Sequence, residues 1–112
     1  MLSSVVREPT FLILAAVAAD PLHGYGILRS VEQLSGGRVQ LRAGTLYAAL
    51  DRLVREGSLL VDHEEVVDGR LRRYYRITDR GLDALRQGVE DLDANVAAAR
   101  RQLIRRAQLG LA

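Results

Sequence analysis

The stretch DGRLRRYYRIT, residues 68–78, is the most informative part of this chain. It begins with Asp68-Gly69, a dipeptide that tolerates the positive φ angles of tight hairpin turns. Runs that contain apolar residues flank this turn, so we predict a β-hairpin with strands Leu59 to Val67 and Leu71 to Thr78. Four arginines and two tyrosines follow the turn, and this composition is typical of a hairpin that binds nucleic acid.

The second strand of this hairpin has two chemically different faces, because side chains alternate along a strand. Tyr75 and Ile77 are predicted to pack on the core. Near the tip, Arg70, Arg72 and Arg73 are predicted to lie along a DNA phosphate backbone or to enter a minor groove. The alternative is a solvated hairpin in which nearby carboxylates balance the arginines, namely Asp62, Glu64, Glu65 and Asp68.

Two helices are predicted ahead of the hairpin. The run from Pro9 to Ala19 is apolar on nearly every face, which indicates a core helix near 9–19. A second helix is predicted near 24–35, where Ser35-Gly36-Gly37 marks its end. Residues 38–41 alternate polar and apolar side chains, and we predict a minimal strand there.

A third helix is predicted over about 44–56. Its inward face carries leucines at i, i+4 and i+7, which are Leu46, Leu50 and Leu53. Its outward arc consists of Gly44, Thr45, Ala48, Asp51, Arg52 and Arg55, with Tyr47 at the edge. The small side chains of Gly44, Thr45 and Ala48 let the helix start approach a phosphate or a base edge closely. Arg52 is predicted to contact a guanine or a phosphate, and an i,i+4 pair is expected between Asp51 and Arg55.

The last predicted element is a long helix with a narrow apolar stripe. Aliphatic residues recur at spacings of three and four, the pattern of a coiled-coil seam: Leu82, Leu85, Val89, Leu92, Val96, Ala99 and Leu103. One small domain cannot bury such a stripe, so we predict pairing with a second copy of the chain. The predicted fold is mainly α with a small β-hairpin, a winged helix-turn-helix over 1–78 followed by a dimerisation helix over 79–112.

Composition excludes several classes of function. Among 112 residues there is no cysteine and there are two histidines, so neither a disulfide nor a histidine-based metal site is expected. No catalytic arrangement and no phosphate-binding loop stand out, so the chain is predicted not to be an enzyme and to need no cofactor. All sixteen basic residues are arginines, and codon bias in a GC-rich genome is the favoured explanation for part of this composition. Arginine nevertheless suits bidentate recognition of phosphate and guanine better than lysine does.

The first residues imitate a secretion signal, because Arg7 precedes an apolar run. Glu8 and Pro9 interrupt that transition, and the run is far shorter than the ~20 residues that span a bilayer. The chain is therefore predicted to be cytoplasmic, without a membrane partner.

Three ring side chains need separate interpretations. Tyr25 stands at the start of the second helix and is predicted to contact a DNA phosphate. Capping and core packing are favoured for His23. His63 lies among carboxylates on a strand and is interpreted as a surface residue rather than a pH sensor.

Together these residues resemble the PadR family of bacterial transcriptional regulators, over nearly the whole chain. The matching blocks are Glu8 to Leu14, Pro21 to Ile27, Gly44 to Leu50, Leu53 with Glu56-Gly57, and Asp68 to Thr78. The resemblance implies a homodimer that binds a palindromic double-stranded DNA operator, usually as a repressor. It also implies that Tyr25, Thr45, Tyr47 and the wing arginines meet DNA. Family members often release the operator on binding a small effector, here expected to be hydrophobic and at the dimer interface, or answer to another cellular signal.

The chain departs from the family pattern at two places. Arg42-Ala43 replaces a common Ser-Pro pair, so the third helix is expected to be less well capped and Arg42 to add a phosphate contact. Some relatives sandwich flat drugs with a tryptophan of the last helix, whereas this chain has no tryptophan and an aliphatic seam. The alternative function is a winged-helix module that binds another protein and no operator.

Overall fold

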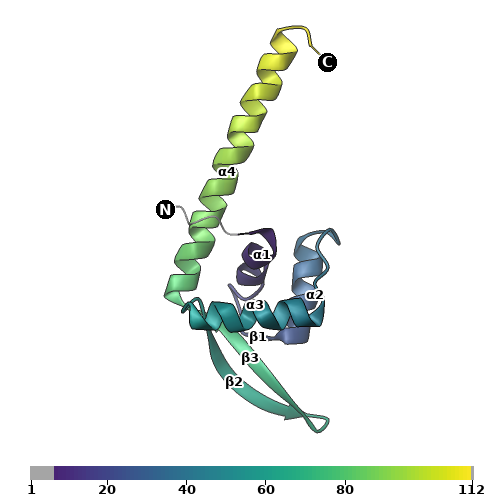
Figure 1. Ribbon diagram of the computed structural model, residues 1–112, viewed down its shortest axis with the longest axis vertical. Helices are drawn as coiled ribbons and strands as arrows, with labels where there is room; N and C mark the ends of the chain where they lie inside the picture. The colour runs from purple at the N-terminus through teal and green to yellow at the C-terminus, as the bar shows by residue number, and fades with distance from the viewer. Residues whose placement is uncertain (1–6, 112) are drawn as a thin grey trace.

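The structure is a computed structural model, and it describes residues 7–111. Its elements are α1 Glu8–Ala16, β1 Leu22–His23, α2 Gly24–Leu34, α3 Ala43–Arg55, β2 Leu59–Val67, β3 Arg70–Ile77 and α4 Asp79–Gln108. The helices α1 to α3 gather beside the sheet into a head, from which the hairpin projects at one end and α4 at the other (Figure 1). This is the predicted winged helix-turn-helix with a long C-terminal helix.

The core of the head lies between α1, α2, α3 and the base of the hairpin. All three inward leucines predicted for α3 are buried, and Ile13 and Leu14 of α1 lie against the same cluster. Burial of each such side chain contributes roughly 1.5–3 kcal/mol of transfer free energy. The apolar sequence of α1 therefore places it at the centre of the head, as predicted.

The third strand of the sheet lies where the sequence did not indicate one. Leu22 and His23 form β1 and pair with Tyr75 and Tyr74, so the strand order is β1-β3-β2. To reach this edge the chain must leave α1 early, and α1 ends at Ala16 instead of near residue 19.

The prediction of a strand over residues 38–41 was wrong. The edge of β3 is already occupied by β1, and residues 38–41 belong to the loop between α2 and α3. Val39 and Leu41 are partly buried against the core, which accounts for the alternation in the sequence.

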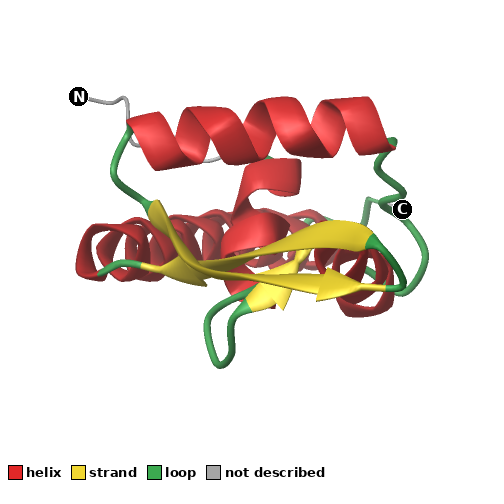
Figure 2. Ribbon diagram, turned by 90° about the horizontal axis from the view of Figure 1, so that it is seen from below, coloured by secondary structure: helices red, strands yellow, loops and turns green. Residues whose placement is uncertain are grey.

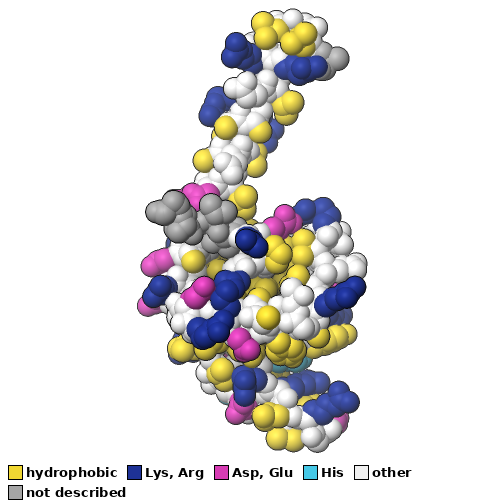
Figure 3. All heavy atoms as spheres, viewed as in Figure 1, with side chains coloured by type: hydrophobic (Ala, Val, Ile, Leu, Met, Phe, Trp, Pro, Cys, Tyr) yellow, Lys and Arg dark blue, Asp and Glu magenta, His cyan; other side chains and the backbone are white. Residues whose placement is uncertain are grey.

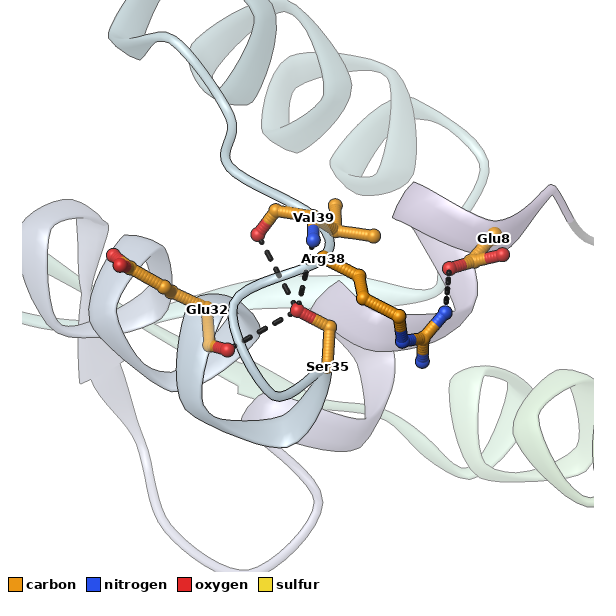
Figure 4. Close-up of polar contacts among 5 residues, drawn as sticks. All are labelled: Glu8, Glu32, Ser35, Arg38 and Val39. Atoms are coloured by element: carbon orange, nitrogen blue, oxygen red, sulfur yellow. Dashed lines mark hydrogen bonds and ion pairs between the residues drawn. The ribbon is translucent and has the colours of Figure 1, made fainter.

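That loop is held by its own polar contacts (Figure 4). The Ser35 hydroxyl donates to the Glu32 carbonyl over 3.1 Å and accepts from the Val39 amide over 3.0 Å. Arg38 forms an ion pair with Glu8, with 3.5 Å between nitrogen and oxygen. The loop therefore connects the end of α2 to the start of α1.

The hairpin formed by β2 and β3, hereafter the wing, has the predicted turn. Asp68 and Gly69 have φ angles of 52° and 75°, both in the left-handed region that this turn requires. The two strands are antiparallel, and their register shifts at a bulge between Val61 and His63. Tyr75 is buried and Ile77 partly buried, so the predicted core face of β3 is confirmed.

Four chain segments meet where the wing ends and α4 begins. Thr78 caps α4, because its hydroxyl oxygen accepts from the Gly81 amide over 3.0 Å. The same hydroxyl donates to the Gly57 carbonyl over 2.6 Å, and the Thr78 amide donates to the Ser58 carbonyl over 3.1 Å. We call these contacts among Gly57, Ser58, Thr78 and Gly81 the Thr78 junction. It ties the end of α3, both strands of the wing and the start of α4 together.

Beyond its first turns α4 leaves the head. Ala84 and Leu85 still pack against the core, whereas every described residue from Leu92 onward is exposed. Hydrophobic side chains recur along this projecting part (Figure 3). Within residues 7–111, no helix is both long and apolar enough to span a membrane.

Replacement of Gly81 by alanine should destabilise the fold by about 1–3 kcal/mol, because the new Cβ would overlap the Ser58 carbonyl oxygen inside the Thr78 junction. Gly44→Ala is the matched control, since no atom of residues 7–111 lies within 4 Å of a Cβ there. That exposed helical site should gain about 0.5 kcal/mol from lower backbone entropy of the unfolded chain. Urea denaturation of both variants measures the difference, and a neutral Gly81→Ala would contradict the tight junction.

Candidate nucleic-acid interface

The start of α3 is an exposed helix N-terminus. Arg42 precedes it with φ −80° and ψ 152°, and no side chain makes a capping hydrogen bond there. The weak capping expected from the Arg42-Ala43 pair is therefore confirmed. Gly44, Thr45 and Ala48 are all exposed beside it, so backbone amides and the positive end of the helix dipole face solvent.

Tyr47 stands next to this surface and is 48% exposed. Its ring lies over Gly24 at the start of α2, where a Cβ would overlap the Tyr47 hydroxyl. A side chain at residue 24 would displace the Tyr47 ring, so glycine at this position lets the ring lie against the start of α2.

A groove lies between α3 and the wing, and Figure 2 shows α3 running along one side of the hairpin. The groove has a volume of about 390 Å³ and is lined by His23, Gly24, Tyr47, Asp51, Leu71, Arg72, Arg73 and Tyr75. It brings together three of the predicted DNA-binding residues, Tyr47 of α3 and Arg72 and Arg73 of β3. Residues 25 apart in sequence therefore share one concave surface.

The wing arginines differ in their partners. Arg73 donates to Glu64 over 3.1 Å, and this hydrogen bond raises the pKa of the guanidinium. Arg76 pairs with Asp62 over 3.5 Å. Arg70 and Arg72 are exposed and form no ion pair within the described part of the chain. Carboxylates thus pair with Arg73 and Arg76, which lie nearer the base of the wing. The positive charges of Arg70 and Arg72 at the tip are available to a partner.

Arg52 lies apart from the groove. One of its guanidinium nitrogens donates to the Thr10 hydroxyl over 2.8 Å and another to Glu56 over 3.2 Å. The i,i+4 ion pair of α3 is therefore Arg52 with Glu56, and no pair between Asp51 and Arg55 forms among the described residues. These bonds direct Arg52 toward α1.

The start of α2 carries a row of rings that the sequence did not reveal. Tyr25 is 62% exposed, with its ring centroid 6.5 Å from that of His23, and Tyr74 of the wing lies 5.2 Å beyond His23. His23 makes no capping hydrogen bond, and its Nδ1 is buried without a partner among the described residues. Burial, followed by the nearby Arg72 charge, lowers the pKa of His23. No periodic signal marks a two-residue strand such as β1, so the row was not foreseeable.

The predicted seam of α4 divides into two parts. Leu82 and Leu85 are partly buried near the head, and Leu85 packs on its core. The remaining five seam residues are exposed, and the exposed fraction reaches 67% at Leu103. This second part, Val89 to Leu103, is an apolar stripe without a partner inside the described chain.

These features define a winged helix-turn-helix protein with an arginine-tipped wing and a free helical stripe. The family model for "Transcriptional regulator PadR-like family" matches residues 13–87, and the chain belongs to this family. The transcriptional regulator Rv3488 of Mycobacterium tuberculosis is 40% identical over 87 residues, which cover 75% of this chain and 78% of that protein. The resemblance seen in the sequence is thus confirmed.

Solved structures share the fold. A PadR family transcription regulator from Clostridium difficile has a TM-score of 0.73 at 21% identity, and the match covers 87% of this chain and 99% of that chain. Bacillus subtilis PadR in complex with operator DNA has a TM-score of 0.63 at 21% identity, with coverage of 70% and 46%.

The bond between Arg52 and Thr10 predicts energetic coupling between α3 and α1. In a double-mutant cycle with Arg52→Ala and Thr10→Ala, the free energies of unfolding should be non-additive by about 0.5–1 kcal/mol. Urea denaturation of the two single variants and the double variant measures this coupling. Additive effects would show that the bond contributes nothing and would leave Arg52 free to serve another partner.

Proposed function

We propose that this chain is a sequence-specific DNA-binding repressor that acts as a homodimer on a palindromic operator in the cytoplasm. The observation that carries the proposal is the groove, where the ring of Tyr47 lies on one surface with the guanidinium of Arg72, which has no ion pair among the described residues. The exposed start of α3 lies one helical turn before Tyr47. The operator complex of Bacillus subtilis PadR, which has the same fold, supports it.

On this proposal α3 enters the major groove, which is wide enough for an α-helix. Thr45 and Tyr47 meet base edges there, and the small side chains of Gly44 and Ala48 let the helix come close. The amides at the start of α3 bind a phosphate, with Arg42 beside them.

Two further elements hold the DNA backbone. Arg70 and Arg72 lie along it from the wing, with Arg73 behind them. Tyr25 contacts it from the start of α2. The wing therefore anchors the protein, and α3 determines the sequence that is bound.

The salt dependence of DNA binding tests this assignment. If a dimer neutralises about eight phosphates, the slope of log affinity against log salt is about −7. Arg72→Ala removes one contact from each subunit and should reduce the slope to about −5, with equal weakening on cognate and unrelated DNA. Fluorescence anisotropy on the DNA flanking the gene measures both quantities.

Arg86→Ala is the matched control for that experiment. It removes the same charge from an exposed site on α4, where Arg86 pairs with Asp83 over 3.4 Å. Its slope should equal that of the parent protein. A parent protein that stays dimeric and binds no DNA even at low salt would favour the alternative, a module that binds another protein.

We propose that the second copy packs on the stripe Val89 to Leu103. Most helical stability in proteins comes from packing of an apolar face, so a partner on this stripe would stabilise the part of α4 that leaves the head. Charge along α4 indicates the orientation: residues 79–93 hold five carboxylates and two arginines, and residues 94–108 hold four arginines and no carboxylate. Antiparallel packing places the basic half of each helix on the acidic half of the other, with the crossing near residue 95.

Single-cysteine variants test this orientation, since the chain has no cysteine of its own. In an antiparallel pair Val89 faces Leu103 of the other copy, so a mixture of Val89→Cys and Leu103→Cys proteins should form a disulfide-linked dimer. Leu103→Cys alone should stay uncrosslinked under the same oxidation. A disulfide-linked dimer of Leu103→Cys alone on a non-reducing gel would show parallel helices.

We further propose that a small hydrophobic effector between the two α4 helices releases the operator. Support comes from the small side chains at the centre of the stripe, Val96 and Ala99, which leave room between paired helices. Aliphatic walls suit an aliphatic ligand better than a flat aromatic one. Loss of anisotropy on titration of candidate ligands into the protein–DNA complex detects such release.

A further inference from the structure

His63 occupies an unusual position on the wing. It follows the bulge in β2 and lies opposite Tyr74, whose ring it stacks on with centroids 4.3 Å apart and planes 11° apart. Its two ring nitrogens both face carboxylates: Nδ1 lies 2.5 Å from Asp62 Oδ2, and Nε2 lies 3.3 Å from Glu65 Oε1. The imidazole thus contacts a carboxylate at each ring nitrogen, and one face of the ring stacks on Tyr74.

This geometry fits only one protonation state. A neutral imidazole has one donor nitrogen and one acceptor nitrogen, so one carboxylate would face a lone pair. The imidazolium donates from both nitrogens and satisfies both carboxylates. In agreement, the hydrogen bond to Asp62 raises the pKa of His63, with Glu65 acting in the same direction against the effect of burial.

The net charge of this face of the wing depends on whether His63 is protonated. From β2 the facing groups are Asp62 and Glu65, and from β3 they are Arg72, Tyr74 and Arg76. On β1, His23 lies beyond Tyr74, and its pKa is lowered, so it stays neutral above its ordinary value of 6.5. Above pH 6.5, His63 is therefore the histidine of this row that changes charge.

We propose that His63 is a positioning residue for DNA binding, which holds Asp62 and Glu65, offsets one of their two negative charges when protonated, and makes the affinity of the wing for DNA depend on pH. This inference rests on the proposed function. When His63 is protonated, both carboxylates are occupied and the charge of Arg72 stays available for phosphate. After deprotonation the two carboxylates repel the DNA backbone and compete for the neighbouring arginines.

The direction of the effect follows from linkage. A nearby polyanion favours the imidazolium, so DNA binding takes up protons and the affinity is highest below the pKa of His63. Affinity should fall as pH rises from 6.5 through that raised pKa. The free energy of unfolding changes in the same direction. The stabilisation that comes with the raised pKa of His63 is fully present below pH 6.5 and is lost as pH rises through that raised pKa.

DNA binding of the full chain, measured by anisotropy from pH 6 to 8.5 at constant ionic strength, tests the proposal. The parent protein should lose about three- to tenfold in affinity across this range. His63→Gln should bind weakly at every pH, and His63→Arg should bind tightly at every pH. Persistence of the parent pH dependence in both variants would overturn the inference.

Glu65→Gln separates titration from a merely structural role. Removal of one carboxylate leaves the ring in place but lowers the pKa of His63, so the midpoint of the affinity curve should move to lower pH. Nuclear magnetic resonance of the histidine ring protons reports the same pKa in the free protein. Absence of DNA binding at every pH would refute the proposed function, whereas strong binding with a flat pH profile would refute only the role of His63.

Discussion

The hydrogen bonds of the Thr78 junction fix how α3, the wing and α4 are joined. One hydroxyl group bonds to the Gly57 carbonyl after α3 and to the Gly81 amide in α4, and the Thr78 amide bonds to Ser58 at the start of the wing. Because Gly81 leaves no room for a side chain, α4 approaches the Ser58 backbone directly. The directions of α3, the wing and α4 are therefore set by a few atoms.

The Thr78 junction also determines the shape of the proposed DNA-binding surface. The wing leaves it on one side and α3 ends on it, so the angle between them determines the width of the groove that holds Tyr47 and Arg72. On the other side, the same atoms determine how α4 leaves the head and where a second copy would present its own groove. A protein that reads a palindrome needs this fixed relation between reading helix and dimer helix.

Much of the fold was predictable from local chemistry. Asp68-Gly69 specified the turn of the wing because few residue pairs accept two positive φ angles, and the leucine spacing of α3 specified its buried face. Non-local pairing was not predictable. Residues 38–41 alternate like a strand, yet the edge of β3 goes to Leu22 and His23, which are too few to show a period.

For the candidate site, too, local features were predictable from the sequence and non-local contacts were not. The exposed start of α3 and the arginines of the wing tip were recognisable, because small residues, an uncapped helix and a turn are local features. The bonds of Arg52 to Thr10, and the stacking of His63 on Tyr74, depend on how distant segments pack. Side-chain partners across 42 residues of sequence leave no pattern in the sequence itself.

If the protein acts as a dimer, two copies of the groove bind two halves of one DNA site. Hydroxyl-radical footprinting on DNA selected from a random library tests this arrangement. We expect an inverted repeat whose two half-sites are protected equally and are separated by about one helical turn or a multiple of it. A single protected segment without inverted symmetry, or no protection at any protein concentration, would contradict the claim.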